Sequence, residues 1–238
     1  MRIDSRQAED CRPIQFETGV NRYAAGSCII EMGHTRVHCT ASLTDELPRW
    51  RRDSGKGWIT AEYRMLPHAT HDRGRREGSS LKGRTAEIQR LIGRSLRASI
   101  DFDGLGPWSL TIDCDVLQAD GGTRTASING GYVAMVMALQ GLVDAGKLPK
   151  LPLIHQVGAV SLGIVDGKAL VDLCYEEDFA AEVDLNLVMT GDGRLIEVQG
   201  TAEEAPYSID ELHEMLSLGK QAIQKITALQ NNVLGLNR

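Results

Sequence analysis

The sequence predicts a protein that mixes α-helices and β-strands, either α/β or α+β, with two related halves. In both halves, segments of alternating apolar and polar residues are interspersed with helical patterns. The clearest linker in the chain, residues 144–152, contains two prolines and a glycine and lies between the halves. We therefore expect one domain over residues 1–238, with approximate halves at 1–143 and 153–238.

The first half is expected to contain four strands and two helices. Alternation of apolar residues predicts the strands, and a stripe formed by Ile88, Leu91, Ile92 and Leu96 predicts the first helix. In order, the elements are a hairpin over residues 27–43 that turns at Gly33-His34, a strand over 58–63, a helix entered at Arg84 and Thr85, a strand over 110–116, and a long apolar helix over 126–143. Residues 64–84 are expected to form a long exposed loop.

The second half repeats this outline. Residues 155–174 form a predicted hairpin that turns at Asp166-Gly167, and two further strands cover residues 183–190 and 194–198. The last helix is expected to begin at a capping box, Ser208-x-x-Glu211. Its predicted apolar side consists of Ile209, Leu212, Leu216, Ile223, Ile226 and Leu229.

Composition places the chain among ordinary soluble proteins, with 42% hydrophobic and 24% charged residues in 238. Its 5 cysteines are scattered and contain no Cys-x-x-Cys pair, which argues against a disulfide framework or a zinc site. The N-terminal residues do not resemble a signal peptide, and no apolar run approaches the roughly 20 residues that span a membrane. We expect a cytoplasmic protein that does not enter a membrane.

Charge is distributed unevenly along the chain, although the net charge is −6. Residues 49–97 hold 13 Lys/Arg against 5 Asp/Glu, whereas the rest of the chain holds 13 against 27. A basic block on an acidic chain indicates a localised surface that binds a polyanion. A solvated arginine-rich loop, or an interface between subunits, would give the same pattern.

A glycine turn within residues 113–131 predicts an anion site. The strand breaks at Gly121-Gly122, and Thr123 and Arg124 follow where the apolar helix begins. Unpaired N–H groups and the positive end of the helix dipole favour an anion there, and Arg124 adds a forked cationic clamp. The alternative is a tight turn in which Thr123 or Thr125 caps the helix and Arg124 is solvated. The stretch is neither a P-loop nor a dinucleotide fingerprint.

An acidic segment over residues 172–186 is the counterpart of the basic block. Five carboxylates besides Asp172 lie within nine residues, between one predicted strand and the next. Clustered carboxylates at strand ends suit Mg²⁺, which keeps several waters and takes few protein ligands. An acidic loop that protects strand edges from aggregation is the alternative.

Four motifs together resemble the ribonuclease PH family, and the resemblance covers nearly the whole chain. They are Gly57–Tyr63 (GWITAEY), Gly83–Arg94 (GRTAEIQRLIGR), Asp113–Ile128 and Ile196–Glu203 (IEVQGTAE). The resemblance implies an α+β fold of two β-α-β-α halves, like the ribosomal protein S5 domain 2-like fold. It also implies assembly into a ring, as a homohexamer built from a trimer of dimers.

The activity that the resemblance implies is phosphorolytic. Members of the family are 3′→5′ exoribonucleases (tRNA nucleotidyltransferases) that trim the 3′ ends of tRNA precursors and other structured RNA such as rRNA. They transfer terminal nucleotides to inorganic phosphate, release nucleoside diphosphates, and can run the reaction backwards. The expected partners are therefore RNA, inorganic phosphate and nucleoside diphosphates, with neither DNA nor a membrane.

Site residues follow from the resemblance position by position. It implies a catalytic and metal-binding role for Asp178 and Asp184, with Mg²⁺ or Mn²⁺ as the metal; Asp184 is also a candidate general acid. It assigns RNA contacts to Arg73 and Arg76. Family members commonly carry Arg where this chain has His68, so a contact there would depend on pH. The implied phosphate ligands are Arg84, Gly122, Thr123 and Arg124.

Two other functions fit the same residues. One is an RNA-binding ring subunit without activity, and the other is a nuclease that uses the acidic cluster with water and releases nucleoside monophosphates.

Overall fold

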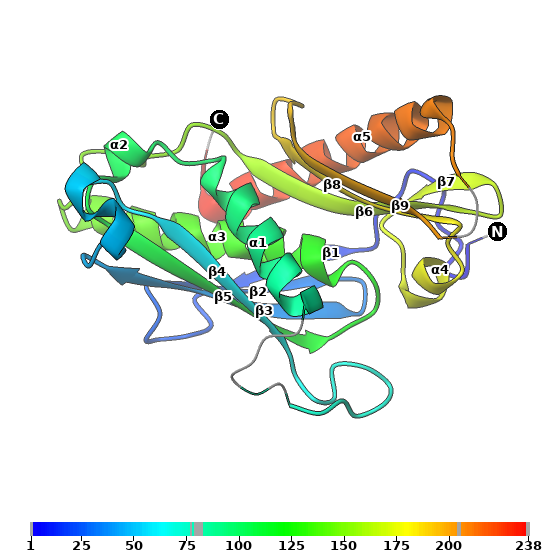
Figure 1. Cartoon of the computed structure of the whole chain (residues 1–238), viewed down its shortest axis with the longest axis horizontal. Coiled ribbons are helices and arrows are strands. Elements are labelled where there is room, and N and C mark those ends of the chain that lie inside the picture. The colour runs from blue at the N-terminus through cyan, green and yellow to red at the C-terminus, as the bar shows by residue number, and fades with distance from the viewer. Residues whose placement is uncertain (1, 77, 79–82, 204–205, 237–238) are drawn as a thin grey trace.

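Two β-sheets and the helices between and beside them make up the computed structural model, which describes residues 2–76, 78, 83–203 and 206–236 (Figure 1). The strands of the first sheet are β1 (Ile14–Thr18), β2 (Gly26–Met32), β3 (Thr35–Thr44), β4 (Ile59–Met65) and β5 (Ser109–Gln118). Those of the second are β6 (Val157–Val165), β7 (Lys168–Val171), β8 (Val183–Thr190) and β9 (Leu195–Ala202). The helices are α1 (Gly83–Arg97), α2 (Phe102–Leu105), α3 (Thr123–Asp144), α4 (Tyr175–Phe179) and α5 (Ile209–Leu234), with a 3₁₀ turn, η1, at Arg49–Ser54.

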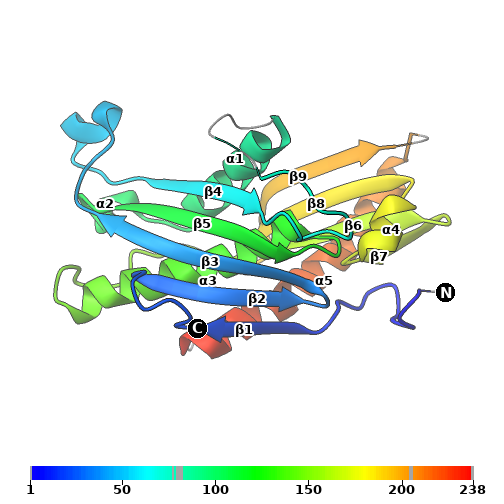
Figure 2. The same cartoon turned by 90° about the horizontal axis from the view of Figure 1, so that it is seen from below.

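The first sheet has the order β1-β2-β3-β5-β4 and the second the order β7-β6-β8-β9. Neighbouring strands are antiparallel except β4 and β5, which run parallel because α1 lies in the crossover between them. Figure 2 shows the five-stranded sheet from its open side, with α3 and α5 behind it. Each half therefore runs strands, helix, strands, helix: β1–β4, α1, β5, α3, and then β6–β7, α4, β8–β9, α5. This is the predicted α+β fold of two β-α-β-α halves.

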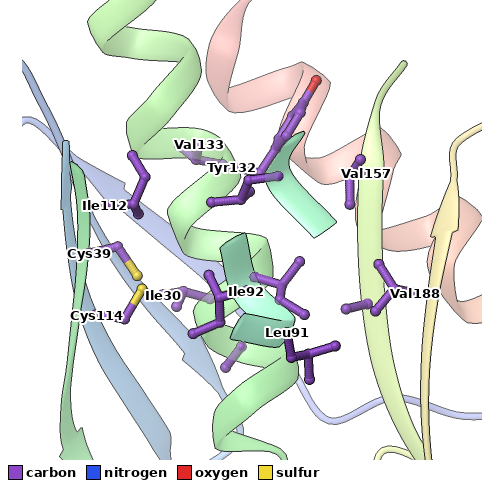
Figure 3. Close-up of a cluster of buried hydrophobic side chains, with 14 of the residues drawn as sticks. Ile30, Cys39, Leu91, Ile92, Ile112, Cys114, Tyr132, Val133, Val157 and Val188 are labelled. Atoms are coloured by element: carbon purple, nitrogen blue, oxygen red, sulfur yellow. The ribbon is translucent and has the colours of Figure 1, made fainter. Parts of the chain in front are cut away.

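The core lies between the two sheets, and α3 runs through it. α3 packs on β2 and β3 on one side and on β6 on the other. In Figure 3, Cys39 and Ile112 of the first sheet face Tyr132 of α3, with Val157 and Val188 of the second sheet beyond it. Because α3 is apolar on nearly all sides, it needs this burial from both directions.

The length of α3 corrects one expectation. Its 22 residues are long and apolar enough to cross a membrane by length and composition, contrary to the prediction that no segment is. However, 78% of its most apolar window is buried inside the protein. α3 is therefore placed as the central helix of the core.

Most predicted elements are confirmed, including both hairpins, the buried stripe of α1 and the capping box at Ser208. The prediction for α5 was partly wrong, because Ile209 and Leu229 are 66% and 37% exposed. Ile223 and Ile226 are buried as predicted, and Met215 and Ala222, which were not predicted, are buried with them. β1, η1, α2 and α4 were not predicted, since each is six residues or shorter. α3 ends at Asp144 and β6 begins at Val157. The boundaries assigned to the halves, 1–143 and 153–238, stay a prediction.

Candidate active site

A cavity of about 170 Å³ is lined by residues from both halves of the chain. The first half contributes the end of β4, the start of α1, the turn that follows β5 and the start of α3, and the second half contributes β6, α4 and β8. The structure thus brings together side chains as far apart in the sequence as Met65 and Asn186. All six residues predicted to bind phosphate or metal line it: Arg84, Gly122, Thr123, Arg124, Asp178 and Asp184.

The glycine turn presents open backbone N–H groups to this cavity. Gly121 and Gly122 have φ of 72° and 66°, a left-handed conformation that favours glycine. A Cβ at Gly121 would also lie 2.2 Å from the carbonyl oxygen of Leu173. Gly122 is the N-cap of α3, so the alternative in which Thr123 or Thr125 caps the helix is wrong. Because the N-cap is a glycine, it offers no side chain to accept hydrogen bonds from the first N–H groups of the helix. The first turn of α3 can therefore bind an anion.

Two contacts fix the side chains that follow the turn. The Thr123 hydroxyl is hydrogen-bonded to the Tyr63 hydroxyl of β4, with 2.9 Å between the oxygens. Burial raises the pKa of Tyr63, and the bond to Thr123 opposes that shift. Arg124 Nη1 lies 3.8 Å from Glu87 Oε2 of α1. These contacts hold α3 against β4 and α1, and so relate Arg124 to Arg84.

The two aspartates line the same cavity, and the charge of Asp178 raises the affinity of Asp184 for a proton. Burial raises the pKa of Asp178, and the charges of Arg84 and Arg124 oppose it. For Asp184, burial and then the charge of Asp178 raise the pKa from 3.8 to about 6, against the pull of Arg124. The pair is therefore a partly desolvated site of excess negative charge, which a cation would relieve.

The remaining carboxylates of the acidic segment have other partners. The segment was predicted as a loop between strands, but it contains the short helix α4, which carries Asp178. Glu177 is buried and pairs with Arg2, with 2.7 Å between Nη2 and Oε2. Glu182 accepts a hydrogen bond from the Gly167 N–H at 3.0 Å. Among the described residues, no group of three or more His, Cys, Asp or Glu is arranged to hold a metal ion, so the metal candidate is the Asp178–Asp184 pair.

Two residues of the second sheet were missed as candidates. Ser161 of β6 and Asn186 of β8 are register partners, and both line the cavity. The Ser161 hydroxyl is buried and has no hydrogen-bond partner among the residues that the structure describes. Asn186 lies two positions after Asp184, on the same face of β8. Apolar neighbours in both strands hide these polar positions in the sequence.

An arginine of the N-terminal segment, also missed, ties the two sides of the cavity together. Arg12 is 4% exposed, and its Nη2 donates to Asp172 Oδ1 at 2.7 Å, just before α4. Its Nη1 donates to the carbonyl oxygen of Asp120, at the start of the glycine turn. Figures 1 and 2 show the N-terminal segment running beside α4 and β7. Arg12 therefore fixes the glycine turn relative to the helix that carries Asp178.

Replacing Arg12 by alanine should destabilise the protein strongly. The change leaves the carboxylate of Asp172, which is fully buried, without its main partner. Removing one member of a buried pair costs about 3–5 kcal/mol. Urea unfolding should show this loss for Arg12→Ala, whereas Arg36→Ala, which breaks the exposed pair with Glu31, should cost under about 1 kcal/mol. Equal losses of unfolding free energy in the two variants would contradict the buried pairing of Arg12 with Asp172.

The raised pKa of Asp184 predicts that Asp184→Asn stabilises the metal-free protein. The folded state binds this proton more tightly than the unfolded chain, so ionisation destabilises the fold as the pH rises from 3.8 through about 6. At pH 8 the variant should gain at most about 3 kcal/mol in free energy of unfolding, and the gain should shrink as the pH falls towards 4. Urea unfolding in a buffer that contains a metal chelator measures this gain in unfolding free energy. Asp192→Asn, at an exposed turn, is the control. A pH-independent difference would contradict the burial of Asp184.

The residues predicted to contact RNA lie outside this cavity. Arg73 and Arg76 are exposed in the segment between β4 and α1. Neither is among the described residues that line the cavity. His68 is exposed and lines a neighbouring cavity of about 810 Å³ together with His34 and His71. The two cavities adjoin, because Thr70 and Ala119 line both. Residues 77 and 79–82 of the predicted loop lie outside the described residues.

Solved structures share the fold. Rrp46 of rice (Oryza sativa) superposes with a TM-score of 0.80 at 18% identity, covering 98% of this chain and 100% of that one. The Archaeoglobus fulgidus exosome with RNA bound to the active site gives a TM-score of 0.81 at 21% identity, covering 95% of this chain and 91% of that one. At these identities the likeness shows the fold alone.

Sequence comparisons are more specific. The family models "3′ exoribonuclease family, domain 1" and "domain 2" match residues 10–139 and 155–222. Ribonuclease PH of Synechococcus sp. (strain JA-2-3B'a(2-13)) is 54% identical over 240 residues, covering 100% of this chain and 98% of that protein. Ribonuclease PH of Crocosphaera subtropica (strain ATCC 51142 / BH68) is 53% identical over 233 residues, covering 98% and 97%. The chain belongs to the ribonuclease PH family of 3′ exoribonucleases.

Proposed function

We propose that this chain is a phosphorolytic 3′→5′ exoribonuclease that acts on tRNA, trimming the 3′ ends of tRNA precursors and of other structured RNA such as rRNA. It transfers the terminal nucleotide to inorganic phosphate, and it adds nucleotides from nucleoside diphosphates in reverse. One observation carries the proposal: an anion site and a carboxylate pair line the same cavity, in a chain of this family.

Inorganic phosphate binds at the start of α3. The N–H groups after Gly122, the Thr123 side chain and the guanidinium groups of Arg84 and Arg124 surround it. This arrangement supports the proposal because the N-terminus of a helix and two arginines together favour a multiply charged anion.

The reaction then needs no protein nucleophile. A phosphate oxygen attacks the phosphorus of the last phosphodiester, and the bond from that phosphorus to the 3′ oxygen of the preceding nucleotide breaks. The attacking phosphate becomes the β-phosphate of the released nucleoside diphosphate. The leaving 3′ oxygen takes up one proton, from Asp184 as the candidate general acid or from water, and becomes the free 3′ hydroxyl of the shortened RNA. Arg84 and Arg124 hold the reactants in line and offset their negative charge, which is most of what phosphoryl transfer asks of a protein.

Asp178 and Asp184 would hold a divalent cation, Mg²⁺ or Mn²⁺. The donor set fits, because two desolvated carboxylates with raised pKa values gain from a cation, and Mg²⁺ accepts one or two carboxylates with waters. When bound, the cation supplies positive charge that offsets charge on the transferring group and on the leaving 3′ oxygen.

Arg73 and Arg76 contact the body of the RNA, so affinity should fall with salt. The logarithm of the binding constant should decrease linearly with the logarithm of salt concentration, and removing both arginines should lower the slope by about one for each RNA phosphate that they neutralise. Filter binding at several salt concentrations measures the slope. Arg22→Ala, between β1 and β2, removes the same charge elsewhere and should leave the slope unchanged. A flat salt response in the parent protein would contradict the role of this loop.

The assembled form is a cytoplasmic homohexamer, a ring built as a trimer of dimers. Membership of the ribonuclease PH family, whose resemblance implies ring assembly, supports this form. Sedimentation should give a particle of six 26.0-kDa chains.

Product analysis separates this function from its competitors. RNA is incubated with the protein and Mg²⁺, with and without inorganic phosphate, and the products are resolved by chromatography. We expect nucleoside diphosphates, released only with phosphate. Nucleoside monophosphates without phosphate would indicate the hydrolytic nuclease, and no release would indicate the inactive RNA-binding subunit.

A further inference from the structure

Three aromatic side chains form a cluster beside the cavity, and we name them the aromatic rim: Tyr175, which lines the cavity, and His71 and Phe179, whose rings contact that of Tyr175. The rings of Tyr175 and Phe179 are stacked, with centroids 6.3 Å apart and planes at 29°. His71 meets Tyr175 edge-on, with 6.2 Å between centroids. Phe179 is 83% exposed and Tyr175 48%, so these rings add little to the core. Exposed aromatic rings that stack on each other are a feature that folding alone does not explain.

The aromatic rim is fixed relative to the reacting groups. Tyr175 and Asp178 both line the cavity, and Tyr175, Asp178 and Phe179 are three and four positions apart on α4, which places them on one side of the helix. The Tyr175 N–H donates to Asp120 Oδ1 at 3.0 Å. Asp120 directly precedes Gly121, so the start of α4 is tied to the phosphate turn.

The size of the cavity determines where the bases of the RNA lie. At about 170 Å³ it is smaller than the roughly 300–1,000 Å³ of pockets that enclose small organic ligands. The cavity has room for phosphate groups, but it has no room for a nucleoside in addition to them. The bases that flank the reacting phosphodiester must therefore lie outside it, where Tyr175 and Phe179 are exposed.

We infer that the aromatic rim is a stacking site for the nucleobases at the 3′ end of the RNA. Stacking on aromatic faces is tolerant of sequence, since every base has a π-face, and this suits an enzyme that removes successive nucleotides whatever their base. Stacking also holds the terminal phosphodiester against Asp178 without filling the cavity. The inference rests on the proposed function, because it supplies the subsite for the substrate of that same cavity.

The test compares Phe179→Leu and Phe179→Tyr with the parent protein, on a single-stranded oligoribonucleotide and on the same RNA with abasic sugars at its two 3′-terminal positions. KM is measured separately for RNA and for phosphate. We expect Phe179→Leu to raise KM for the normal RNA by about 5- to 100-fold, to leave KM for phosphate unchanged, and to bind the abasic RNA as the parent does. Phe179→Tyr, which keeps an aromatic face, should retain the parent KM.

Three results would overturn the inference. The first is a KM for RNA in Phe179→Leu equal to that of the parent, and the second is an equal rise in KM for normal and abasic RNA. The third is a changed sedimentation coefficient of Phe179→Leu with unchanged RNA affinity, which would make Phe179 a contact between copies of the chain. Fluorescence of Phe179→Trp is a readout independent of turnover, and it should be quenched by the normal RNA and not by the abasic one. If the parent protein releases no nucleoside diphosphate, the proposed function fails, whereas this quenching still decides the stacking site.

Discussion

Asp184→Asn should abolish phosphorolysis while leaving RNA binding largely intact. Asp184 contributes half of the carboxylate pair, and an amide cannot supply the negative charge that holds a divalent cation. The contacts proposed for the body of the RNA, Arg73 and Arg76, lie instead on the exposed segment before α1. Turnover should therefore fall below detection in the product assay, while filter binding gives an affinity near that of the parent protein.

Asp192→Asn is the matched control for this variant. Asp192 lies at the turn between β8 and β9, where its side chain accepts hydrogen bonds from Thr190 and Arg194. It is not one of the described residues that line the cavity. Its turnover should equal that of the parent. If Asp184→Asn instead loses RNA binding together with turnover, Asp184 supports the structure and not the reaction.

Arg124→Ala should lower the rate of phosphorolysis by about 10²-fold or more. The guanidinium lines the cavity where phosphate is proposed to bind, and removing one such preorganised donor costs about this much in other enzymes. Its ion pair with Glu87, at 3.8 Å with Glu87 exposed, contributes too little to stability to explain such a loss. Steady-state rates over a range of phosphate concentrations measure the effect.

Two controls accompany Arg124→Ala. Arg194→Ala removes an arginine that is paired with Asp192 and exposed, and it should keep the parent rate. Added guanidinium ions should restore part of the activity of Arg124→Ala, because they can enter the space that the side chain leaves. A parent rate in Arg124→Ala with phosphate present would show that the phosphate site is wrongly placed.

The sequence predicted the parts of the fold and site that depend on short-range patterns. Alternation and glycine turns identify the hairpins, and the i, i+3, i+4 spacing of Ile88, Leu91 and Ile92 identifies α1. Gly121 and Gly122 predicted a tight turn before α3, and the structure confirms the turn, because both adopt a left-handed conformation that few other residues adopt.

Features that depend on contacts distant in sequence could not be predicted. Arg12 pairs with Asp172, 160 residues later, and no local pattern distinguishes it from the solvated arginines around it. Ser161 lies in an apolar strand, so only the three-dimensional structure shows that its hydroxyl faces a polar site. The exposure of Phe179 likewise depends on how α4, a helix of five residues, packs on the rest of the protein.

In the proposed reaction, inorganic phosphate in the cavity is the nucleophile. Following the phosphorus atom of this phosphate into the products tests that step. RNA is degraded by the parent protein in the presence of radiolabelled inorganic phosphate, and the released nucleotides are separated and cleaved at the β-phosphate. We expect all of the incorporated label in the β-phosphate of nucleoside diphosphates and none in the shortened RNA. Release of unlabelled nucleoside monophosphates would contradict it.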